Sequence, residues 1–186
     1  MFHIAPHLET KRLYLRPFQP GDLDVLAALC ANPDVMRYVG HGVRTRKETE
    51  TGLHRMIAHW QAHGFGMWKL VEKETGAFVG RAGLIHLDST PEIEVGYVLD
   101  CSFWGCGLAT EAARVCLQFG FDTLGLERIV AIARPENLAS QRVMQKLGMT
   151  YEKAASYYNC AVVYWAIARE HCSARHPLTV FPLKLA

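Results

Sequence analysis

Gly105 and Gly107 are the residues whose spacing most directly suggests chemistry. They lie between the apolar run Val95–Leu99 and a helical pattern of small and apolar residues that begins with Ala109. Because glycine carries no Cβ, a loop of this kind can bring successive backbone N–H groups close to a ligand. The unpaired amides at the start of the following helix favour an anion, and phosphate in particular. The segment therefore predicts a phosphate-binding loop between a strand and a helix.

Two common nucleotide motifs do not fit this loop. A dinucleotide fingerprint, Gly-x-Gly-x-x-Gly/Ala, needs glycine or alanine at a position where this chain has Thr110. The Gly-x-x-x-x-Gly-Lys-Ser/Thr sequence of a P-loop does not occur in the chain. The phosphate compound is therefore expected to be of another kind.

His59 and His63 form a second group with chemical potential. Their spacing of four residues places two imidazoles on one face of a predicted helix, which is compatible with metal binding. The sequence indicates no third ligand, however. We therefore expect a solvated helix face here and no metal.

Strands and helices alternate around these residues. The hydrophobic periodicity predicts strands over 9–18, 66–72, 77–87, 92–99, 128–133, 151–157 and 160–169. It predicts a first helix that begins after the N-cap Asp22 and runs through Leu29. Further helices are predicted over 45–61 and over 109–124. A further helix should begin at the N-cap Asn137 and end before Gly148. Strand, loop and helix thus follow one another twice, at 92–124 and at 128–148.

Length and composition indicate a single domain. A chain of 186 residues with 50% hydrophobic residues can bury one substantial core, which we place at 1–170, followed by a tail at 171–186. The tail packs either on the domain or on a second subunit, so a homodimer stays open. The formal net charge of +2 favours neither nucleic acid nor a membrane surface as partner. No signal peptide is apparent, and the six cysteines lack a Cys-x-x-Cys pair, so we expect free thiols and a cytoplasmic location.

Three segments of the chain resemble the RimJ/RimL branch of the GCN5-related N-acetyltransferase (GNAT) superfamily. The loop Trp104-Gly105-Cys106-Gly107-Leu108-Ala109 is similar to the family's Gln/Arg-x-x-Gly-x-Gly/Ala pyrophosphate loop. The opening Thr10-Lys-Arg-Leu-x-Leu-Arg-Pro and the pattern Asn-x-x-Ser-x-x-Val-x-x-Lys-x-Gly-Met from Asn137 onward also resemble this branch. The resemblance covers residues 8–170.

The resemblance implies an α/β (α+β) fold and a way of binding acetyl-CoA. The GNAT fold is a mixed, mostly antiparallel sheet of about 6–7 strands, splayed between the fourth and fifth strands and flanked by about 4 helices. Acetyl-CoA would lie in the splay, and its pantetheine would pair with the backbone of one strand end. The residues implied to contact acetyl-CoA are Tyr97, Val98, Leu99, Trp104, Gly105, Cys106, Gly107, Leu108, Ala109, Thr110, Asn137 and Ser140.

The implied reaction is the direct attack of a primary amine on the thioester of acetyl-CoA. The amine belongs to a protein N-terminus or to a small molecule, and a base or a water chain must remove its proton. The resemblance points to Glu94 as the base, since the family commonly carries a glutamate two residues before this Gly-Tyr pair. Alternatively, Glu94 forms an ion pair with a basic residue on a neighbouring strand.

The sequence offers several candidates for the acid that protonates the leaving thiolate. Many acetyltransferases have a tyrosine seven residues after the motif asparagine, and this chain has Met144 there. The resemblance then leaves Ser140, with His86 and Tyr97 as alternatives. Because the usual tyrosine is missing, a catalytically silent acyl-CoA-binding module remains the alternative function.

Overall fold

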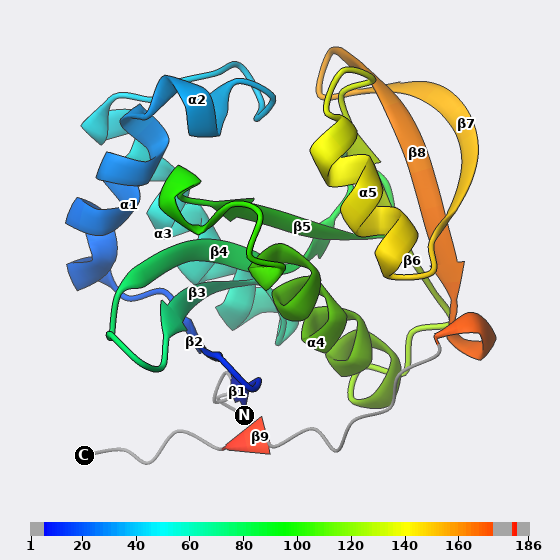
Figure 1. Cartoon of the computed structure of the whole chain (residues 1–186), viewed down its shortest axis with the longest axis horizontal. Helices are drawn as coiled ribbons and strands as arrows, with labels where there is room; N and C mark the ends of the chain where they lie inside the picture. The colour runs from blue at the N-terminus through cyan, green and yellow to red at the C-terminus, as the bar shows by residue number, and fades with distance from the viewer. Residues whose placement is uncertain (1–5, 173–179, 182–186) are drawn as a thin grey trace.

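A single sheet of nine strands runs through residues 6–172 and 180–181, which the computed structural model describes. The strands lie in the order β7-β8-β6-β5-β4-β3-β2-β1-β9, and every neighbouring pair is antiparallel except β5 and β6 (Figure 1). Their bounds are β1 His7–Glu9, β2 Leu13–Pro17, β3 Met67–Glu72, β4 Phe78–His86, β5 Ile93–Leu99, β6 Arg128–Ala133, β7 Thr150–Tyr157, β8 Cys160–Ala168 and β9 Val180–Phe181.

Helices cover both faces of this sheet. They are α1 Leu23–Ala31, α2 Pro33–Met36, α3 Arg46–His63, α4 Leu108–Asp122 and α5 Leu138–Lys146, with short 3-10 turns at Pro20–Asp22, Cys101–Phe103 and Arg169–His171. Side chains of α1, α2 and α3 form one core cluster, against which Phe78 and Val98 pack. Helix α4 contributes to the larger cluster on the opposite face, together with Val95 and Leu99. None of the helices described is long and apolar enough to cross a membrane.

Local signals explain where α3 begins and ends. The Thr45 side chain accepts a hydrogen bond from the Glu48 backbone N–H, and the Glu48 carboxylate accepts one from the Thr45 N–H, which satisfies two otherwise free donors. Gly64 ends the helix in the left-handed conformation, at φ +72°. Leu53 and Trp60 are buried along its inner face.

The sheet divides between β5 and β6. These parallel strands pair at one register position, Glu94 opposite Val130, whereas β5 pairs with β4 over its whole length. Figure 1 shows β6, β8, β7 and α5 diverging from β5 beyond this point. The splay between the fourth and fifth predicted strands, 92–99 and 128–133, is therefore confirmed, as is the fold class.

The start of the chain differs from the prediction of a single strand over 9–18. Residues 9–18 contribute to two strands, β1 and β2, which form an antiparallel hairpin. The Thr10 hydroxyl accepts a hydrogen bond from the Leu13 N–H, and the Thr10 N–H donates to the Leu13 carbonyl, so the turn closes on itself. Together with β9, this hairpin extends the sheet beyond the 6–7 strands expected.

Asp22 occupies the N-cap position of α1, as predicted, but it does not cap the helix with its side chain. Its carboxylate instead accepts hydrogen bonds from Arg16 and Lys69, at 2.6–2.8 Å. Burial by itself would raise the pKa of Asp22, but these bonds and one from the Gln19 backbone lower it to about 2. Two nearby cations thus outweigh the local capping interaction.

The tail at 171–186 lies mostly outside the described residues. Of this segment the structure describes His171, Cys172 and the strand β9, which pairs antiparallel with β1.

Candidate functional site

The glycine loop has the backbone geometry that the sequence predicted. Gly105 and Gly107 have φ values of +77° and +80°, a region that residues with a Cβ rarely adopt, and Gly107 is the N-cap of α4. A Cβ at Gly105 would meet no atom within 4 Å, so this side of the loop is open. The first amides of α4 have no acceptor within the helix and carry its positive dipole end. The loop can therefore hold a phosphate group.

An ion pair that sequence reasoning missed holds this loop against the β1–β2 hairpin. The Arg12 guanidinium donates to the Glu111 carboxylate at 2.7 Å and to the Cys106 carbonyl oxygen at 2.8 Å. The Thr10 hydroxyl and the Arg12 backbone N–H also donate to Glu111. Burial would raise the pKa of Glu111, but these bonds lower it. Glu111 is thus a charged anchor between the first turn of α4 and the hairpin.

Trp104 connects the loop to the end of β5. Its ring is about half exposed, and its Nε1–H donates to the Leu99 carbonyl oxygen at 2.9 Å. Asp100 shapes the short turn between them by accepting a hydrogen bond from the Ser102 N–H. Tyr97 and Val98 are half-buried on the part of β5 that β6 does not pair with.

Tyr97 and Ser140 meet across the splay. The Tyr97 hydroxyl donates to the Ser140 carbonyl oxygen at 3.1 Å and lies 3.0 Å from Ser140 Oγ. Asn137 caps α5 as predicted, since its Oδ1 accepts from the Ser140 N–H at 3.1 Å. Burial raises the pKa of Tyr97, so this hydroxyl stays protonated. The hydroxyl pair therefore joins β5 to α5 at the place where the strands separate.

Glu94 is a buried carboxyl residue at the register position where β5 pairs with β6, next to the splay. Its exposed fraction is 8%, and its Oε2 has no hydrogen-bond partner among the described residues. Burial raises the pKa of Glu94 to about 8. No ion pair in the described part of the chain includes Glu94, so the alternative of a structural pair with a basic neighbour is not seen. A carboxyl with this pKa can accept or release a proton near neutral pH.

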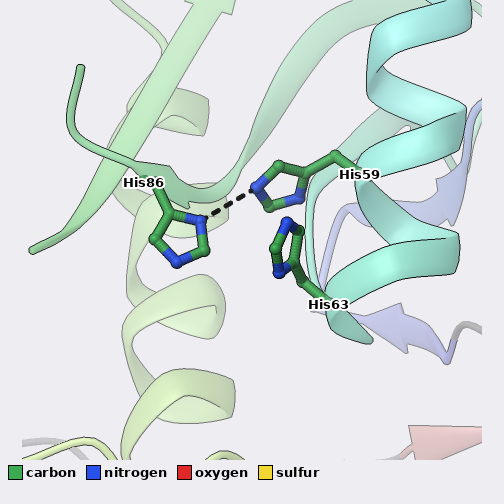
Figure 2. A group of neighbouring side chains, drawn as sticks. All are labelled: His59, His63 and His86. Carbon is green, nitrogen blue, oxygen red and sulfur yellow. Dashed lines mark hydrogen bonds between the residues drawn. The ribbon is translucent and has the colours of Figure 1, made fainter. Parts of the chain in front are cut away.

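The structure also locates Met144 and His59, two further residues that the sequence analysis singled out. Met144, at the position of the usual tyrosine, is buried in the core and has no proton to give. His59, expected on a solvated face without a third ligand, is half-buried and lies 3.3 Å from His86, which the sequence did not connect with it (Figure 2). The expectation of a solvated face holds for His63, which is exposed, but not for His59. The third histidine was missed because the folding of the sheet brings His86 of β4 next to α3.

Comparison with known proteins shows which family the chain belongs to. Residues 12–150 match the family model of the acetyltransferase (GNAT) domain. The chain is 34% identical over 155 residues to YkkB of Bacillus subtilis, covering 82% of this chain and 90% of YkkB. It is 27% identical over 141 residues to spermidine N(1)-acetyltransferase of Escherichia coli, covering 74% and 73%.

Solved structures show the same fold. An acetyltransferase from Agrobacterium tumefaciens superposes with a TM-score of 0.79 at 30% identity, over 87% of this chain and 94% of that one. The family match covers the glycine loop, Glu94 and the Asn137–Ser140 pair. The chain therefore belongs to the GNAT family of acetyltransferases, which implies acetyl-CoA as the acetyl donor.

Proposed function

We propose that this protein is an N-acetyltransferase of the RimJ/RimL-like branch that moves an acetyl group from acetyl-CoA to a primary amine. The observation that carries the proposal is Glu94, a buried carboxyl with no partner on Oε2 and a pKa of about 8. A buried, unpaired ionisable group destabilises a fold, and groups of this kind are concentrated at functional sites. Its place beside the splay supports a role as the base of the reaction.

The splay and the loop would bind acetyl-CoA. Amides of the loop, from Gly105 to Thr110, hold the pyrophosphate, and the open outer side of Gly105 leaves room for it. The backbone of β5 from Tyr97 to Leu99 pairs with the pantetheine where β6 is no longer paired. Asn137 uses its Oδ1 for the helix cap, so its amide N–H groups are the part that reaches the pantetheine.

In the proposed reaction each proton transfer has a defined donor and acceptor. The ionised Glu94 takes a proton from the acceptor ammonium, and the neutral amine attacks the thioester carbon. A C–N bond forms, the attacking nitrogen loses its second proton to solvent, and the C–S bond breaks. Glu94 releases the proton that it took to solvent before the next turnover. The Ser140 hydroxyl gives its proton to the departing sulfur and regains one from solvent, while the Tyr97 hydroxyl holds it in place. The products are the acetylated amine and CoA.

A partly buried arginine favours one class of acceptor. Arg81 has an Nε without a hydrogen-bond partner in the described part of the chain, and its guanidinium contacts Met56 of α3. It lies opposite Val98, on the face of the sheet that also carries Glu94. A cation there repels a polyamine and attracts carbonyl or carboxylate oxygens. A peptide N-terminus or a small amine that bears a carboxylate is therefore the favoured acceptor.

A thiol-release assay tests the proposal. Native protein, Glu94→Gln and Ser140→Ala are given acetyl-CoA with peptides that have free N-termini, amino acids or polyamines. We expect turnover with peptides or amino acids, and a kcat lowered about 100-fold or more in Glu94→Gln with acetyl-CoA binding unchanged by calorimetry. Binding of acetyl-CoA without turnover on any amine would support the silent binding module instead.

A further inference from the structure

Three histidines from two distant parts of the chain converge at the end of α3. His59 and His63 lie one turn apart on that helix, and His86 is the last residue of β4 (Figure 2). One ligand nitrogen from each lies within 4.8 Å of the other two. The shortest separation, His59 Nε2 to His86 Nδ1, is 3.3 Å.

A hydrogen bond from the second ring nitrogen of His59 shows which nitrogen carries the hydrogen. His59 Nδ1 lies 2.8 Å from the Phe65 carbonyl oxygen, which can only accept, so Nδ1 carries the hydrogen. The lone pair is then on Nε2, which faces His86. Metal-bound histidines are typically held in this way, with the second ring nitrogen donating to a carbonyl or carboxylate oxygen.

Burial favours the neutral form of two of the rings, and the neutral form is the one that binds a metal. Burial lowers the pKa of His59 and of His86. Phe65 packs beside the three rings, with ring centroids 5.0–5.9 Å away, and forms an apolar wall on one side. His63 is exposed, so the opposite side is open to solvent.

We propose that His59, His63 and His86 form a binding site for a divalent transition-metal ion, with zinc as the reference ion. Tetrahedral zinc holds imidazole nitrogens about 2.0–2.1 Å away, so two ligand nitrogens lie about 3.3 Å apart. His59 and His86 already have this separation. The exposed His63 needs a side-chain rotation to complete the set.

Besides the rotation of His63, binding needs a change of tautomer at His86. Without metal, the hydrogen between the facing nitrogens must belong to His86 Nδ1, because His59 already carries its hydrogen on Nδ1. With metal, His86 carries the hydrogen on Nε2 and its Nδ1 lone pair binds the ion. Three neutral imidazoles suit zinc, cobalt, nickel or copper rather than calcium or magnesium, which prefer oxygen ligands.

The site would join α3 to the sheet. His86 follows Ile85, the register partner of Glu94, so the metal would fix the end of β4 relative to the end of α3 without providing a group for acetyl transfer. This proposal does not depend on the proposed reaction, and its test does not use activity.

The test is metal titration of the full chain, purified without a histidine tag and freed of metal with a chelator. We expect calorimetry to show one zinc ion per chain. Cobalt should give visible d–d absorption of a nitrogen-bound ion without thiolate-to-cobalt charge transfer. Zinc should also raise the thermal midpoint of unfolding, by an amount that grows with the logarithm of its concentration.

Variants decide which side chains bind the metal. His63→Ala removes an exposed ring and should retain the native circular dichroism, while zinc affinity falls about tenfold or more. His86→Gln should have the same effect on zinc. The control is His54→Ala, an exposed histidine on α3 outside the cluster, which should leave affinity unchanged. Unchanged affinity in His63→Ala and His86→Gln, thiolate charge transfer, or no binding by the native chain would overturn the proposal.

Discussion

The Glu94→Gln substitution should change how the stability of the protein depends on pH. Glutamine has nearly the shape of the protonated glutamic acid but cannot ionise. Native Glu94 is buried, and its pKa is about 8 in the folded protein against 4.5 for an exposed glutamate. Between these two values the folded chain holds a proton that the unfolded chain has lost. The free energy of unfolding must therefore decrease as pH rises through this range.

The size of the effect follows from the two pKa values. The stability contributed by protonated Glu94 is fully present below pH 4.5 and is lost as pH rises towards about 8. The loss is about 1.4 kcal/mol per pH unit, or on the order of 5 kcal/mol over the whole range. Tyr97 and Tyr158, which interact electrostatically with Glu94, have pKa values raised above 10 and stay neutral throughout.

Urea denaturation of the native protein and of Glu94→Gln at several pH values measures this effect. Because all other groups titrate in both proteins, the difference between the two free energies isolates residue 94. The free energy of unfolding of the variant, relative to that of the native protein, should increase by about 1.4 kcal/mol per pH unit between about pH 5 and pH 8. Glu50→Gln, at an exposed position on α3, should follow the native curve. Parallel curves for native protein and Glu94→Gln would refute the assignment of a buried carboxyl with a raised pKa.

Two other substitutions test the loop and the core. Gly107→Ala places a Cβ at φ +80°, so it should cost about 1–2 kcal/mol in denaturation and weaken acetyl-CoA binding in calorimetry. Gly21→Ala, with open space around its Cβ, is the control, and equal losses in both variants would contradict a conformational role. Asp22→Asn leaves two basic side chains without their carboxylate, and we expect a loss of about 3 kcal/mol at neutral pH. The pKa of Asp22 is lowered to about 2, so its contribution to the free energy of unfolding is present above pH 3.8 and is lost as pH falls towards 2. The control is Asp24→Asn, which removes an exposed ion pair with Arg46 and should cost less than about 1 kcal/mol.

The sequence by itself determined the features that depend on neighbouring residues. Strand β6 was predicted with its observed bounds, Asn137 caps α5, and Gly148 follows it at φ +82°. The glycine loop has the backbone conformation expected of it. Caps, turns and alternation follow from backbone geometry over a few residues, so they can be recognised without knowing the fold.

Only the tertiary structure decided which distant side chains meet. Arg12 and Glu111 are 99 positions apart in the chain, and His86 lies 27 positions from His59. Both contacts depend on the order and register of the strands, which a single sequence does not specify. For the same reason Asp22 could be placed at the start of α1 but not with its carboxylate on Arg16 and Lys69. Burial, and with it the pKa of Glu94, is likewise a property of the packed sheet and its helices rather than of the residues near Glu94 in the chain.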